Sequence, residues 1–156
     1  MTVESMTSFV HILAATTWVG GIIYMVLVLL PSLKTLDPSS AKVLMGGLSK
    51  RFTMVAWTSI ILLIITGGMQ IQPGTLFDFS SQYGTFLTIK LGSVLLMILI
   101  ALYITFALYP KVRKLAPAPG EEPSSEFVSL QRRLPLLAKI NLILGILVIF
   151  SFSMLY

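Results

Sequence analysis

The chain has 156 residues, of which 56% are hydrophobic and only 11% are charged, and its mean hydropathy is +0.93. Soluble domains carry roughly 25% charged residues, so this composition excludes a soluble globular domain as well as a disordered chain. The sequence contains no cysteine, which excludes disulfides, iron–sulfur clusters and thiolate metal sites. The net charge is +5 at pH 7.

Four apolar stretches are long enough to cross a bilayer, because about 20 apolar residues span its hydrocarbon core. The residues before the first apolar stretch include Glu4 and no basic residue. The first stretch is therefore interpreted as a retained helix and not as a signal peptide. The sequence therefore predicts an all-α integral membrane protein, a four-transmembrane-helix bundle that forms one membrane domain over residues 1–156. The predicted spans are about 9–30, 52–69, 84–109 and 136–154.

The basic residues indicate how the bundle is oriented. Nine of the eleven lysines and arginines lie in the connections 31–51 and 110–135, whereas the leader and the connection 70–83 contain none. The positive-inside rule assigns the basic connections to the cytoplasm, so both termini are expected outside, in the cell membrane of a prokaryote. Topology thus accounts for the positive charge, and the bilayer, not nucleic acid, is the predicted partner.

Both cytoplasmic connections are expected to contain short interfacial helices, the first of which runs into the second span. Asp37 followed by Pro38 is typical of a helix start, with an N-cap and a proline at the first helical position. In the second connection, Phe127, Leu130 and Leu134 form an apolar stripe at helical spacing.

The first and third spans share a pattern that suggests an internal repeat. Pro31 and Pro110 each stop a span at its basic side, and a shift of 79 residues superimposes them. The same shift places His11 on Lys90, each twenty residues before its proline, which is about 30 Å of helix. We therefore expect His11 and Lys90 at similar depth near the outer boundary of the hydrocarbon.

His11 is the only histidine of the chain, and it lies inside a span. Ionisable residues there are costly and indicate function by default, although an interfacial histidine bonded to a neighbouring group is the alternative. An imidazole nitrogen is the commonest metal ligand, which makes His11 a candidate ligand for copper or for haem.

Lys90 has two interpretations. Its ammonium group extends to the outer headgroups, or burial leaves a neutral amine that serves as a second axial ligand of haem b.

Three methionines are predicted at the outer mouth together with His11. They are Met6, Met69 and Met154. Thioethers and imidazole suit Cu(I), so these residues form a candidate copper site. Methionine is also a common packing residue, which is the alternative interpretation.

The stretch from His11 through Trp18 to Gly20-Gly21, with Pro31 closing the helix, resembles the first span of CopD-type copper resistance membrane proteins. The segment Gly84-Thr-Phe-Leu-Thr-Ile-Lys90 resembles the lysine-bearing helix of that group. HemJ-type haem-binding membrane proteins are similar in the same two places. The second resemblance implies that His11 and Lys90 are haem ligands.

Three functions remain open. The first is a CopD-like protein that handles copper at the outer leaflet, by binding or uptake, with an extracytoplasmic copper carrier as partner. The second is a b-type haem protein that exchanges electrons with a carrier, and the third is an accessory subunit of a homodimer or larger membrane complex. No catalytic constellation is recognisable, so an enzyme is not predicted.

Overall fold

The computed structural model describes residues 2–117 and 121–155, and all regular structure in these residues is helical. Within these described residues, four helical rods are long and apolar enough to cross a membrane: Val3–Leu33, Ser39–Gln70, Gln82–Lys114 and Ser125–Ser153. The predicted all-α membrane fold with four spans is confirmed. The rods comprise α1 (Val3–Tyr24), the π-helical η1 (Met25–Leu29), α2 (Leu30–Leu33), α3 (Pro38–Gln70), α4 (Gln82–Leu102), the π-helical η2 (Tyr103–Leu108), α5 (Tyr109–Lys114) and α6 (Ser125–Ser153).

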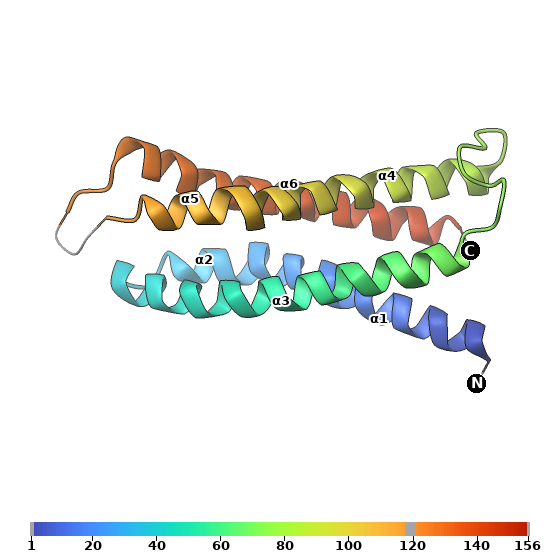
Figure 1. The fold of residues 1–156 in the computed structure, drawn as a ribbon, viewed down its shortest axis with the longest axis horizontal. Coiled ribbons are helices and arrows are strands. Elements are labelled where there is room, and N and C mark those ends of the chain that lie inside the picture. Colours follow the sequence, from blue (N-terminus) through green and yellow to red (C-terminus); the bar gives the residue numbers. More distant parts are fainter. Residues whose placement is uncertain (1, 118–120, 156) are drawn as a thin grey trace.

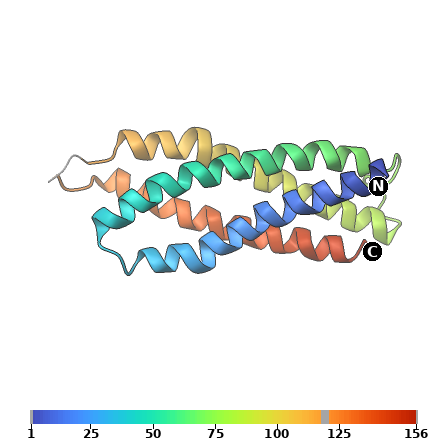
Figure 2. The same cartoon turned by 90° about the horizontal axis from the view of Figure 1, so that it is seen from below.

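The rods form two antiparallel hairpins, and α1 packs on α6 to join them (Figure 1). The first hairpin consists of α1, η1 and α2 against α3, and the second of α4, η2 and α5 against α6. The start of α1, the end of α6 and the loop between α3 and α4 lie together, and we call this the terminal end. The ends of α2 and α5 and the start of α6 lie at the opposite, basic end (Figure 2).

Small residues bring the helices close together at two points. A Cβ atom on Gly145 of α6 would lie 3.1 Å from Cγ1 of Val19 on α1, and one on Gly21 of α1 would lie 2.7 Å from the Phe52 ring of α3. Close approach at small residues is how membrane helices gain packing contacts without a hydrophobic driving force. Around these points lies the buried core, formed by Trp18, Val19, Ile22, Val26, Ala56, Ile60 and Met97.

The predicted helix start at Asp37 is confirmed. The Asp37 carboxylate accepts hydrogen bonds from the backbone N–H groups of Ser39 and Ser40, at 3.1 and 3.0 Å. The hydroxyl of Ser39 bonds to it as well, and these bonds hold the pKa of Asp37 well below its usual value. The helix that starts here runs into the second span, as expected, and continues without a break to Gln70. The second predicted interfacial helix likewise continues through Pro135 into the fourth span.

A π-helical segment precedes Pro31 and Pro110. The prediction that these prolines stop their spans is wrong, because the helix continues past each of them, to Leu33 and to Lys114. Proline lacks an N–H donor, and its ring clashes with the carbonyl four residues earlier. Widening the helix ahead of the proline relieves this conflict, and η1 and η2 each end two residues before Pro31 and Pro110. The shift of 79 residues that relates the prolines also superimposes the two π segments, which adds a shared structural feature to the suggested repeat.

The loop between α3 and α4 folds tightly over the start of α4. Asp78 accepts hydrogen bonds from the hydroxyls of Ser80 and Ser81, which lower the pKa of its carboxyl group. A Cβ atom on Gly84 would lie 2.3 Å from the Asp78 carbonyl oxygen, so only glycine fits beneath the loop. Phe77 adopts a positive φ of 59°, and its N–H bonds to the Thr88 hydroxyl at 3.1 Å.

Candidate functional site

His11 lies in the contact between α1 and α3 near the terminal end, and its ring is partly buried. Its Nδ1 atom is 2.8 Å from Oγ1 of Thr66 on α3. The Thr66 hydroxyl in turn donates to the Leu62 carbonyl oxygen one turn earlier, at 2.6 Å. Thr66 itself is buried. The imidazole of the first helix is therefore anchored to the backbone of the second span through one threonine.

This chain of hydrogen bonds determines which ring nitrogen carries the proton. A hydroxyl has a single hydrogen, and that of Thr66 is used by the Leu62 carbonyl. Oγ1 of Thr66 must then accept from Nδ1–H of His11, which leaves the lone pair of the neutral ring on Nε2. Metal-bound histidines typically show this arrangement, in which the second nitrogen donates to a fixed acceptor and thereby orients the ring.

Gly67 makes room for the imidazole beside α3. A Cβ atom at this position would lie 3.2 Å from Cε1 of His11, tighter than ordinary van der Waals contact. At the neighbouring Gly68 an added Cβ would meet nothing within 4 Å. The first glycine of the pair thus leaves the space that the ring occupies, whereas the second does not face the ring.

Lys90 occupies the corresponding place in the second hairpin. It is partly buried on α4, and its Nζ atom lies 5.3 Å from the centroid of the Phe152 ring on α6. An ammonium group over an aromatic face is stabilised by the quadrupole of the ring. Lys90 also lies near enough to His11 for an electrostatic interaction between the two side chains. The two predicted residues thus interact electrostatically, while their role as ligands stays a prediction.

The three methionines are placed on different helices with exposed side chains. Met6 in α1 is 47% exposed, Met69 near the end of α3 is 63% exposed, and Met154 at the end of α6 is 37% exposed. All three lie toward the terminal end, where they are accessible and not buried in the core. That these methionines and His11 coordinate one copper ion stays a prediction. In the described part of the chain, no three histidine, cysteine or acidic side chains gather in a way that could hold a metal.

Some residues of this region escaped sequence reasoning. Thr66 and Phe152 were not singled out, although each is the direct partner of a predicted site residue. The α6 side of the bundle also holds two buried oxygens, Oδ1 of Asn141 and Oγ of Ser151, that find no hydrogen-bond partner among the described residues. Thr66 and Phe152 could not be identified as partners from the sequence, because contacts between helices depend on how those helices are aligned, which no local pattern reveals.

Comparison with protein-family models gives a match to copper resistance protein D over residues 46–155. The chain belongs to the CopD family. The CopD match begins inside α3 and covers the whole second hairpin, including Lys90 and Phe152, and it also covers Thr66 and Gly67. His11 lies outside the matched residues. Searches of the curated proteins and of the solved structures each found no match.

The family and the fold together show a multi-pass membrane protein related to copper resistance. This agrees with the resemblance noted from the sequence.

Proposed function

We propose that this CopD-family protein binds copper at its terminal end, with Nε2 of His11 as the central ligand, as a step in copper handling or uptake. The observation that supports this most directly is the hydrogen-bond chain from His11 to Thr66 to the Leu62 carbonyl. It holds the imidazole in the tautomer that offers the lone pair of Nε2 to a metal. A partly buried imidazole is costly unless its polar atoms have partners, and a metal would be the partner of Nε2.

The ligands proposed beside His11 are the thioethers of Met6, Met69 and Met154. They are exposed toward the same end of the bundle, and each side chain has three rotatable bonds with which to reach an ion. Imidazole and thioether are soft enough to favour Cu(I) over harder cations such as magnesium or calcium. The proposed ion is cargo that exchanges at the surface, and no reaction is assigned to it.

The direction of exchange follows from the proposed orientation. The basic connections lie at the end of the bundle opposite His11, and the positive-inside rule assigns them to the cytoplasm. His11 and the methionines then face the outer side of a prokaryotic cell membrane. An extracytoplasmic copper carrier is the partner that this placement favours, and a homodimer or a larger membrane complex is compatible with it.

The proposal is tested with the full chain purified in detergent and loaded with Cu(I) against a competing chelator. We expect one copper ion per chain in the wild type and loss of that ion in His11→Ala. The matched pair is Met69→Leu and Met54→Leu, since both methionines lie on α3 and are 63% and 64% exposed. Met69→Leu is expected to weaken binding by about tenfold, whereas Met54→Leu leaves it unchanged.

The same preparation distinguishes the alternatives. A Soret band that is lost in His11→Ala would overturn the copper proposal and support haem b with His11 and Lys90 as ligands. Protein that carries neither copper nor haem after expression with both supplied would also overturn it, and would support an accessory role in a larger complex.

A further inference from the structure

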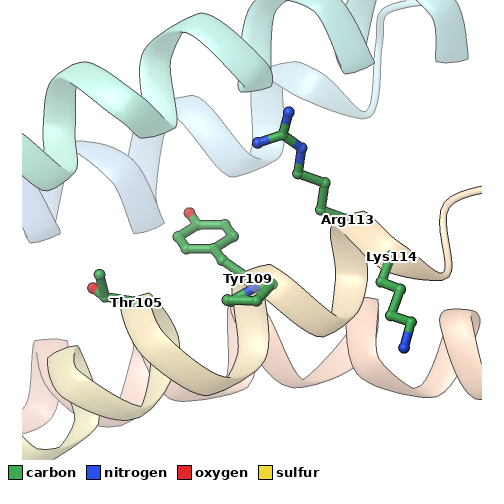
Figure 3. A pocket seen from close by; sticks show the side chains of 5 residues that line it. Thr105, Tyr109, Arg113 and Lys114 are labelled. Carbon is green, nitrogen blue, oxygen red and sulfur yellow. The ribbon is translucent and has the colours of Figure 1, made fainter.

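The basic end of the second hairpin contains a hollow that the copper proposal does not use. It has a volume of about 560 Å³ and is lined by Thr105, Tyr109, Pro110, Arg113 and Lys114. Thr105, Tyr109 and Arg113 are spaced by four residues and therefore lie on one face of the continuous helix formed by η2 and α5. Figure 3 shows these three side chains pointing toward the first hairpin, with Lys114 pointing away from it.

The Thr105 hydroxyl is held in place at the inner edge of this hollow. The indole Nε1–H of Trp57 on α3 donates to Oγ1 of Thr105 at 3.3 Å, and the Trp57 ring packs against Phe106 with centroids 6.0 Å apart. Indole nitrogen is only a donor, so the hydroxyl hydrogen of Thr105 is not used in this bond. It has no acceptor among the described residues, and so it is available to a ligand.

Two cations complete the hollow on its outer side. Arg113 and Lys114 are exposed in the last turn of α5, where positive side chains also complement the helix dipole. The dipole explains cations at this position, but it does not explain a threonine and a tyrosine aligned below them. An arginine fork binds the oxygens of a phosphate in a bidentate manner, and hydroxyl groups donate to the remaining oxygens.

The surroundings favour a lipid over a soluble anion. The hollow lies at the end of a membrane span, and the adjacent surface of η2 and α4 is apolar and exposed: Leu102 by 37%, Tyr103 by 41% and Phe106 by 69%. A ligand with acyl chains can lie along this surface while its headgroup occupies the hollow. Basic pockets between spans on the basic side of a membrane protein are typical sites for anionic lipid headgroups.

The first hairpin serves as an internal comparison. The 79-residue shift replaces Thr105, Tyr109 and Arg113 by Val26, Leu30 and Lys34. The corresponding face of the first hairpin therefore retains a cation but has no hydroxyl groups beneath it.

We propose that the hollow formed by η2 and α5 binds the headgroup phosphate of an anionic phospholipid, with Arg113 as the charged contact, Tyr109 and Thr105 as hydroxyl donors, and Lys114 adding positive charge at the rim. The site is independent of the copper proposal. It lies in the leaflet at the basic end, which the positive-inside rule makes the inner one.

The test uses the full chain in detergent, titrated with phosphatidylglycerol or with phosphatidylcholine, with bound lipid counted by native mass spectrometry. Wild type is expected to retain phosphatidylglycerol selectively. Arg113→Gln with Lys114→Gln is expected to weaken that binding by about tenfold. The matched control is Arg132→Gln with Arg133→Gln, which removes the same charge from exposed residues in the same connection and is expected to change binding by less than about twofold.

Tyr109→Phe removes one hydroxyl without changing the charge and is expected to weaken lipid binding by about threefold, so it tests the site even if the double variant does not fold. Equal losses in the two double variants would overturn the proposal, because they would indicate general attraction to a positive surface. Displacement of phosphatidylglycerol by millimolar inorganic phosphate would overturn it as well, in favour of a site for a free anion.

Discussion

The two hairpins share one plan and differ in the polar group that each carries at the terminal end. In both, the first rod has a π segment followed by a proline, and a titratable side chain lies twenty residues before that proline. In the first hairpin this side chain is an imidazole bonded to the Thr66 hydroxyl. In the second it is an ammonium group placed over the Phe152 ring.

The difference shows how one position in a scaffold can serve two purposes. The bond to Thr66 uses one nitrogen of His11 and leaves the other with a lone pair, so the imidazole remains able to bind a metal. A protonated lysine has no lone pair, and its contact with the aromatic face already stabilises its charge. We therefore interpret the first hairpin as the ligand-bearing one and the second as the source of a fixed positive charge beside it.

The largest effect is expected when the first hairpin loses its anchor. Thr66→Val keeps the shape of the side chain but removes the acceptor for Nδ1–H, so the ring is no longer oriented. Loss of such a supporting bond lowers metal affinity by roughly 10- to 100-fold. Cu(I) competition titration measures the change. Thr58→Val on the same helix, at an exposed position, is the control and is expected to leave the affinity unchanged.

A second prediction concerns the charge contributed by the second hairpin. Lys90→Met removes a cation that acts electrostatically on His11, and relief of this repulsion is expected to strengthen copper binding by roughly fivefold. Lys139→Met removes the same charge from an exposed site on α6 and is expected to have no effect. A loss of the bound group in Lys90→Met would instead identify the lysine as a ligand, as the haem alternative requires.

A smaller effect is expected at the glycine beside the imidazole. Gly67→Ala places a Cβ atom 3.2 Å from Cε1 of His11, so the ring must move by a few tenths of an ångström, which disturbs its bond to Thr66. We expect copper affinity to fall by about threefold in the same titration. Gly68→Ala meets nothing within 4 Å and serves as the control. Equal effects of the two substitutions would show that helix propensity, not the ring position, is responsible.

The smallest effect is expected in the loop that joins the hairpins. Hydrogen bonds from Ser80 and Ser81 lower the pKa of Asp78 in the folded protein. The stability that they contribute is therefore present above the unfolded pKa near 4 and is lost as the pH falls toward the lower folded value. Asp78→Asn is expected to lower the Tm by about 1–2 °C at pH 7, with the difference shrinking as the pH falls below the unfolded pKa toward the lower folded value. A difference that persists at low pH would contradict this origin.

Much of the fold followed from patterns that act locally. Hydropathy predicted the four spans. Asp37 predicted the start of a helix because an N-cap side chain bonds only to the backbone of the first turn that follows it. The equal spacing of His11 and Lys90 to Pro31 and Pro110 predicted a similar depth in the bundle, and their role as ligands stays a prediction. Their partners Thr66 and Phe152 were not predictable, because a contact between helices depends on the relative rotation and offset of both. The π segments were not predicted either, since they arise from a conflict between each proline and the turn before it.

The π segments affect the direction in which His11 and Lys90 point around the axes of their helices. A π bulge accommodates one residue more than the regular helix, and one residue corresponds to a rotation of about 100°. Deleting a single residue from Met25–Leu29 would thus swing His11 around the axis of its rod relative to the basic half, and the same deletion in Tyr103–Leu108 would swing Lys90. Each π segment therefore determines the direction in which a side chain several turns away points from the helix axis.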